Sequence, residues 1–289
     1  MTNQEIIDAF DRIRSWKRGS ERAPNKPLLI LLALAELQNG KTTLVQYQQI
    51  EDRLRNLLID FGPPRKSVNP QYPFVRLSND GIWEFNKPEL IDTSSDPSSQ
   101  FLNDHGISAG FISEIRDTLI KDPFLLKEIA WMILSKNFPE SLHEDILLST
   151  GLDLTESKKR KRDSLFRDKI LIAYEYQCAV CSFSVRLAKK NIAIEAAHIK
   201  WHEANGPDSE NNGIALCTMH HKLFDFGAFT LKNNIILVSE LVNGTGAREW
   251  LTRFHGKSLK LPQRKKSYPD PKYTEWHVNE VFKGMEREI

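Results

Sequence analysis

The chain has 289 residues, of which 40% are hydrophobic and 27% are charged, and its net charge at pH 7 is +2. This is the composition of an ordinary globular protein long enough for two domains, and a charge so nearly balanced predicts no particular partner. The longest apolar run, residues 28–35, is too short to cross a bilayer, and the amino terminus lacks the basic and apolar segments of a secretory leader, so we expect neither membrane binding nor secretion.

The first part of the chain is predicted to be helical. Thr2 and Glu5 form a capping-box pattern ahead of apolar residues that share one helical face. Pro27 stands at the start of a second helix, residues 28–37, which is apolar nearly all round and is therefore expected to be buried. A third helix is predicted at residues 50–61, because a Gly-Pro-Pro sequence stops the apolar pattern there.

The periodicity changes after the third helix. Residues 72–77 and 82–85 flank the turn sequence Ser-Asn-Asp-Gly, which predicts a β-hairpin. Two further helices are predicted at residues 108–120 and 122–136, and Asp122 is the expected cap of the second. Helices followed by a hairpin indicate a mainly helical, winged-helix-like domain.

A polar and highly charged segment separates two predicted domains, residues 1–152 and residues 167–289. Residues 153–166 form the predicted linker, and positions 158–162 are five consecutive basic residues. Such a run is usually solvated, but it could also contact phosphate.

The second domain is predicted to mix strands and helices, so the fold class of the whole chain is α+β. A helix is expected at residues 169–176, a short strand at 192–196 and a metal-bearing helix at 213–224. Two apolar segments, 229–232 and 235–238, flank an Asn-Asn pair and predict a second hairpin.

The cysteines predict a metal site. Cys178 and Cys181 have two residues between them, as have Cys217 and His220, and no cysteine of the chain is left over. Three thiolates and one imidazole at this spacing are typical ligands of a structural Zn²⁺ ion. The odd number of cysteines argues against a disulfide framework.

Sequence motifs around this site resemble those of McrA-like HNH nucleases, which have a ββα-metal core. The resemblance covers residues 167–289 and is carried by three segments, namely 197–201, 212–217 and 221–225. It implies a metal-dependent DNA endonuclease, because hydrolysis of a phosphodiester needs a base to activate water and a cation to balance the developing charge.

The HNH resemblance assigns a role to each polar residue of the motifs. His198 is implied to be the general base, and Asn212 is implied to hold it in orientation through bonds from its amide to the backbone. His221 is implied to bind a catalytic Mg²⁺ or Mn²⁺ ion, and Asp225, four residues later on the same helical face, is a companion ligand.

One position departs from the HNH pattern. Many of these nucleases have an acidic residue or a histidine immediately before the base, where this chain has Ala197. Glu195 is a candidate substitute ligand, and the alternative is a zinc-containing DNA-binding protein without nuclease activity.

The first domain resembles the sulfur-binding domain that is fused to HNH nucleases restricting phosphorothioated DNA. The segments that carry this resemblance are 26–29, 61–64, 72–74, 79–83 and 138–143. In that family an apolar pocket with a Tyr-Pro pair accepts the sulfur, which implies Tyr72 and Pro73 here. Sulfur is less well hydrated than the oxygen it replaces, so an apolar wall favours it by desolvating the oxygen. The implied contacts to the DNA backbone and bases are Arg22, Asn25, Lys26, Arg65 and Arg76.

These resemblances together predict a restriction endonuclease of the bacterial cytoplasm that binds phosphorothioated double-stranded DNA and cuts nearby. Cleavage of both strands by one HNH site would need a homodimer or two successive nicks. An alternative is that the first domain reads a modified base, which would require an aromatic cage such as Tyr72 and Trp83 could form.

Overall fold

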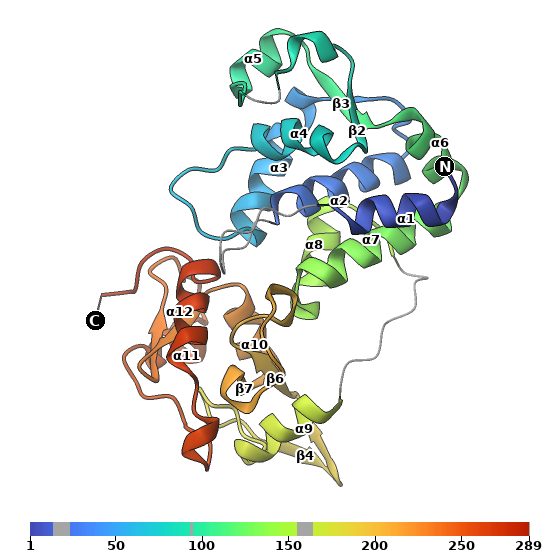
Figure 1. Ribbon diagram of the computed structural model, residues 1–289. Helices are drawn as coiled ribbons and strands as arrows, with labels where there is room; N and C mark the ends of the chain where they lie inside the picture. The colour runs from blue at the N-terminus through green and yellow to red at the C-terminus, as the bar shows by residue number, and fades with distance from the viewer. Residues whose placement is uncertain (14–23, 93–94, 155–163, 289) are drawn as a thin grey trace. The chain divides into compact units, whose positions relative to one another are not determined.

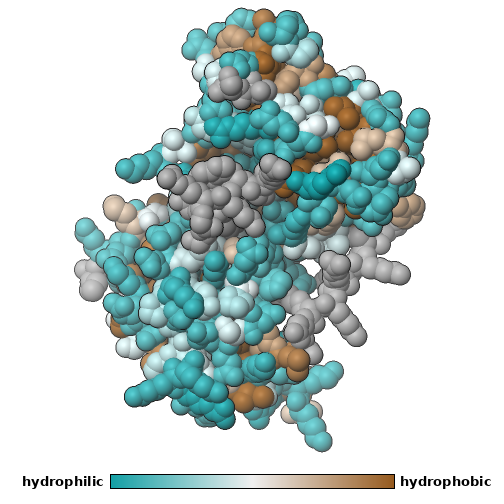
Figure 2. All heavy atoms as spheres, in the orientation of Figure 1, coloured by the Kyte–Doolittle hydropathy of each residue, from teal (hydrophilic) through white to brown (hydrophobic). Residues whose placement is uncertain are grey.

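The computed structural model describes residues 1–13, 24–92, 95–154 and 164–288. It divides into two compact units, Met1–Lys158 and Lys159–Ile289, and both contain helices and small sheets, which confirms the α+β class (Figure 1). Among the described helices, none has the length and apolar character needed to cross a membrane. The face of the molecule in Figure 2 is covered mostly by hydrophilic side chains.

Unit 1 is mainly helical, with one small sheet. The sheet has the order β1-β3-β2, with both pairs antiparallel, and its strands are β1 (Val45–Gln46), β2 (Trp83–Phe85) and β3 (Ser108–Phe111). Its helices are α1 (Asn3–Asp11), α2 (Asn25–Gln38), α3 (Tyr47–Phe61), α4 (Gln71–Arg76), α5 (Ser99–Asp104), α6 (Ser113–Lys121), α7 (Pro123–Asn137) and α8 (Glu140–Thr150).

The core of unit 1 forms around α2. This helix is buried at most positions, as its apolar sequence predicts, and it packs against α3 and α7. Next to it the ring of Phe74 packs edge to face on Trp83, and Trp83 does the same on Phe111. The capping box of Thr2 and Glu5 is formed, and Asp122 caps α7 as predicted.

The predicted hairpin of unit 1 is wrong. Residues 72–77 are helical, in α4 and the 3₁₀ turn η1 (Leu77–Asp80), and β2 pairs instead with β3, whose residues were predicted to begin a helix. Pro73 is tolerated because the first N–H groups of a helix have no partner within it. The winged-helix interpretation rested on that hairpin and loses its support.

Unit 2 consists of small antiparallel sheets and helices. In its described part the paired strands are β4 (Val185–Leu187) with β5 (Lys190–Ile192), β6 (Ile194–His198) with β7 (Gly213–Cys217), and β8 (Phe229–Lys232) with β9 (Ile235–Val238). The helices are α9 (Ser164–Ala173), α10 (Thr218–Asp225), α11 (Ala247–Trp250) and α12 (Pro271–Glu280).

The hairpin predicted in unit 2 is confirmed, but two helix predictions need correction. Asn233 and Asn234 both have positive φ, as a tight hairpin turn requires. The predicted helix 213–224 is a strand, β7, followed by the helix α10, because residues 213–217 are all buried and pair with β6. The predicted helix 169–176 is α9, which begins earlier and ends at Ala173, before the left-handed backbone of Glu175 and Tyr176.

Candidate functional site

Four predicted ligands of a metal ion lie together in unit 2. The ligand atoms of Cys178, Cys181, Cys217 and His220 are all within 4.8 Å of one another. The pairing of β7 with β6 places Cys217 directly before α10, and His220 follows in the first turns of that helix. The four residues therefore converge as their spacing predicts.

The imidazole of His220 is oriented for this cluster. Its Nε2 donates a hydrogen bond to the carbonyl oxygen of Trp250 at 2.8 Å. Its Nδ1 lies 3.1 Å from the sulfur of Cys217 and 3.7 Å from that of Cys178. A backbone carbonyl that fixes one ring nitrogen and directs the other toward a metal is the usual environment of a metal-binding histidine.

The electrostatics of the cluster also suit a cation. The side chains of Cys178 and Cys217 lower the pKa of the Cys181 thiol. Burial by itself would lower the pKa of His220, but its hydrogen bonds to Cys181 and Cys217 raise that pKa to about 9. A metal ion bound by these four residues would replace the protons that they otherwise carry.

The predicted general base, His198, ends β6 and is held on two sides. Its Nε2 lies 2.7 Å from Oδ1 of Asp208, and its ring stacks on Phe166 with a centroid distance of 3.9 Å. The side chain of His198 remains 22% exposed, so a ligand can reach it. Asp208 was not predicted, because it lies in an irregular loop whose path the sequence pattern does not reveal.

Asn212 braces the loop between β6 and β7. Its Oδ1 accepts a hydrogen bond from the backbone N–H of Lys200 at 2.8 Å, and its Nδ2 donates to the carbonyls of Lys200 and Pro207 at 3.0 Å each. Asn212 is completely buried, so no water competes for these bonds. The bonds from its amide to the backbone are those expected of this residue.

The predicted ligands of a catalytic ion are neighbours in space. His221 contacts Glu195 through Nδ1 at 2.7 Å and Asp225 through Nε2 at 3.2 Å. Burial by itself would lower the pKa of His221, but Asp225 and Glu195 raise it to about 9. Because its two nitrogens contact different carboxylates, these three residues do not converge on one point. Among the described residues, only the Cys3His cluster does so.

In unit 1, Tyr72 and Pro73 lie on α4. Tyr72 is half-buried and Pro73 is buried. The guanidinium of Arg76, one turn later, lies 4.6 Å from the centre of the Tyr72 ring. A ligand approaching α4 therefore meets an aromatic ring and a cation together.

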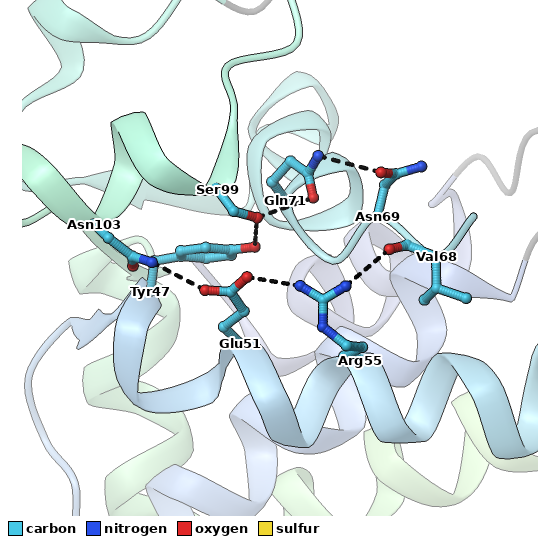
Figure 3. A network of polar contacts seen from close by, with 8 residues as sticks. All are labelled: Tyr47, Glu51, Arg55, Val68, Asn69, Gln71, Ser99 and Asn103. Carbon is cyan, nitrogen blue, oxygen red and sulfur yellow. Dashed lines mark hydrogen bonds and ion pairs between the residues drawn. The ribbon is translucent and has the colours of Figure 1, made fainter.

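A polar network positions α4 (Figure 3). Arg55 on α3 donates to the carbonyl of Val68 at 3.1 Å and pairs with Glu51 at 2.8 Å. The hydroxyl of Ser99 contacts Tyr47 at 2.7 Å and Gln71 at 3.3 Å, and burial raises the pKa of Tyr47 to about 12. Both the loop before α4 and its first residue are thereby tied to α3 and α5.

The predicted DNA contacts differ in their surroundings. Lys26 pairs with Asp80 at 2.5 Å, with 18% and 9% of the two side chains exposed, which favours a structural role that ties α2 to the turn after α4. Arg65 is exposed between α3 and α4, and Asn25 is the half-buried first residue of α2. Arg22 and the basic run 158–162 lie outside the described residues.

The aromatic residues of unit 1 argue against a cage for a flipped base. Trp83 is only 5% exposed and packs in the core. It also lines a small hollow of about 20 Å³, together with Leu32, Val45 and Phe111, and neither Tyr72 nor Pro73 lines that hollow. Trp83, which would have to face Tyr72 in such a cage, is therefore already packed in the core.

Two family models match separate parts of the chain. A family model described as a ScoMcrA-like DNA sulfur-binding domain matches residues 3–155. A second model, described as an HNH endonuclease, matches residues 178–232. The search of curated proteins found no match at the threshold applied.

Several solved structures are similar to parts of the chain. The sulfur-binding domain of ScoMcrA complexed with phosphorothioated DNA is 20% identical with a TM-score of 0.43, covering 50% of this chain and 94% of that one. The corresponding SprMcrA domain is 16% identical with a TM-score of 0.45, covering 54% and 98%. ScoMcrA itself, described as a type IV phosphorothioation-dependent restriction endonuclease, is 20% identical with a TM-score of 0.43, and the similarity covers 54% of this chain and 35% of ScoMcrA.

We expect the purified chain to carry one tightly bound metal ion at the Cys3His cluster, measured by elemental analysis. Replacing Cys217 by serine removes one thiolate and should reduce the bound metal several-fold. The control is Asp225→Asn, which lies outside the cluster and should keep that ion. An unchanged metal content in Cys217→Ser would contradict this assignment.

Replacing Asn212 by alanine should loosen the strand pair β6–β7. Three hydrogen bonds are lost, so the free energy that opens these strands should fall by about 2–3 kcal/mol, measured by hydrogen exchange of their amides. Asn191→Ala, which removes a single side-chain bond on the β4–β5 hairpin, should change the exchange of β6 and β7 little. Equal protection in the two variants would rule out a bracing role for Asn212.

Replacing Arg55 by methionine should increase the mobility of α4. The carbonyl of Val68 and the carboxylate of Glu51 lose their partner, so amides in residues 71–77 should exchange about tenfold faster. Arg12→Met, at the residue that follows α1, serves as the control. If exchange is as slow as in the unaltered chain, the network does not position α4.

Proposed function

Because the chain belongs to the family with a ScoMcrA-like DNA sulfur-binding domain, we propose that it is a modification-dependent restriction endonuclease. Residues 1–152 bind phosphorothioated double-stranded DNA, residues 153–166 link the domains, and residues 167–289 hydrolyse nearby phosphodiester bonds. The observation that carries this proposal is the match of a DNA sulfur-binding family and an HNH endonuclease family to separate parts of one chain.

The proposed reading of sulfur depends on α4. The half-buried ring of Tyr72 would supply the apolar wall, with Pro73 buried next to it in α4, and the network of Arg55, Glu51 and Ser99 supports the position of this helix. A phosphate oxygen placed against this wall loses its hydration without a replacement, whereas sulfur loses less. The selectivity for sulfur thus comes mainly from the free energy that a phosphate oxygen loses when it is desolvated.

In the proposed nuclease site His198 accepts the proton of the attacking water. Its hydrogen bond with Asp208 orients the imidazole and stabilises the imidazolium that forms. Asn212 keeps the loop that follows His198 in place, so the base is positioned before the substrate arrives.

Two metal sites belong to the proposal. The Cys3His cluster has the soft ligands that suit a structural Zn²⁺, and with β6, β7 and α10 it would form a ββα-metal core. His221 and one of its two carboxylates, Glu195 or Asp225, would hold Mg²⁺ or Mn²⁺, because carboxylate oxygens suit such ions and each ring nitrogen faces only one carboxylate. When bound, that ion supplies positive charge for the phosphate.

Glu195 is the proposed substitute for the acidic ligand that is missing at Ala197. Ala197 is buried in β6 and is paired with Ile214 in β7, so a ligand is not presented there. Glu195, earlier in the same strand, reaches His221 instead. An acidic ligand is therefore available at a shifted position. A homodimer and two successive nicks both remain compatible with double-strand cleavage by one such site.

The direct test compares one plasmid prepared with and without phosphorothioate linkages, in Mg²⁺ and in Mn²⁺. We expect cleavage of the sulfur-containing plasmid alone, and His198→Ala should slow it by about 10²–10⁴-fold because the general base is lost. The control His202→Ala removes an exposed imidazole from the same loop and should retain cleavage.

Three other outcomes would change the proposal. Equal cleavage of both plasmids would keep the nuclease and reject sulfur recognition. Undiminished cleavage by His198→Ala would reject the assignment of the base. Cleavage of neither plasmid would favour the alternative of a DNA-binding protein without nuclease activity.

A further inference from the structure

Arg76 is a predicted DNA contact that lies beside the ring of Tyr72, and in this structure it already has an anionic partner. Its Nε donates to Oδ1 of Asp96 at 2.8 Å, and its Nη2 contacts the other carboxylate oxygen. The two side chains are 47% and 31% exposed, and the pKa of Arg76 is raised by its hydrogen bond to Asp96.

Arg76 contacts both carboxylate oxygens of Asp96, and a guanidinium can contact two oxygens of a phosphate in the same way. A guanidinium presents parallel N–H groups that fit the two oxygens of a carboxylate or of a phosphate equally well. Arg76 also lies over the ring of Tyr72, so a phosphate whose sulfur contacts that ring would bring its remaining oxygen to the same guanidinium. Asp96 therefore engages the N–H groups of Arg76 that a phosphate would need.

The ion pair of Lys26 and Asp80, near α4, is less exposed to water than that of Arg76 and Asp96. Lys26 and Asp80 are both largely buried, so separating them would leave a buried charge without a partner. Arg76 and Asp96 can separate more readily, because water reaches both groups. Exchange of a carboxylate for a phosphate is thus feasible at Arg76.

We propose that Asp96 is an intramolecular competitor of DNA phosphate, which sets how weakly the domain holds unmodified DNA. The proposal rests on the proposed role of this domain in binding DNA. An ordinary phosphate that displaces Asp96 exchanges one bidentate ion pair for another, and the net gain is small. A phosphorothioate presents only one non-bridging oxygen to Arg76, but it adds the burial of its sulfur against Tyr72, and this burial gives marked DNA the larger gain.

The test is a double-mutant cycle in the full chain, with His198→Ala present to prevent cleavage. Asp96→Asn, Arg76→Met and their combination are compared by fluorescence anisotropy on two duplexes of one sequence, with and without a phosphorothioate. Asp96→Asn should tighten binding of both duplexes about threefold, the size expected when an exposed ion pair need no longer be broken. In the Arg76→Met background the same substitution should have no effect.

The control and the contradicting results separate competition from other roles of Asp96. Asp117→Asn removes an exposed carboxylate on α6, away from α4, and should change neither affinity. Weaker binding by Asp96→Asn would mean that Asp96 orients Arg76, and equal tightening in the Arg76→Met background would mean a general effect of charge. Either result overturns the proposal.

The same data distinguish a failure of the proposed function from a failure of the competition by Asp96. If the cycle behaves as expected but every variant binds both duplexes equally, sulfur recognition fails and the competition stands. If sulfur is preferred and the cycle shows no coupling, only the competition fails. Absence of any DNA binding would overturn both.

Discussion

The antiparallel pairing of β6 with β7 is the constraint on which the site in unit 2 depends. Its register sets Ile194 opposite Cys217 at one end and His198 opposite Gly213 at the other. The first end leads into the Cys3His cluster and α10, and the second leads into the loop that Asn212 braces. A Cβ at Gly213 would lie 2.3 Å from Cδ1 of Ile170 in α9, so a side chain there would force Ile170 to move. One strand pair thereby supports a metal cluster and a proposed base.

In unit 1 the corresponding constraint is the attachment of α4 to its neighbours. This short helix has too few residues to be stable alone, so it depends on tertiary contacts. Phe74 is buried against Tyr47 and Trp83, while Arg55 and Ser99 hold the residues before Tyr72. Apolar packing and a polar network therefore fix the face that carries Tyr72 and Arg76. Asp96, next to α5, then decides how available that face is to a phosphate.

The parts of the fold that could be predicted are those determined by the spacing of residues close together in the sequence. The metal cluster follows from two chelating pairs, and the β8–β9 hairpin follows from Asn233 and Asn234 between apolar segments. Residues 72–77 were mistaken for a strand because so short an apolar segment fits both periods. Residues 213–217 were mistaken for helix because no breaker separates them from α10. Asp208 and Asp96 lie in loops, and only tertiary structure brings them to their partners.

In the proposed function, unit 1 binds the sulfur-containing site and unit 2 cuts the DNA close to it. The most direct measurement is to sequence the ends that the chain produces from a long linear duplex carrying a single phosphorothioate site, beside the Tyr72→Ala variant. We expect the ends of the DNA fragments to cluster around the sulfur for the unaltered chain, and we expect Tyr72→Ala to lose this cluster. Ends distributed evenly along the duplex, or a cluster that Tyr72→Ala leaves intact, would contradict the proposed function.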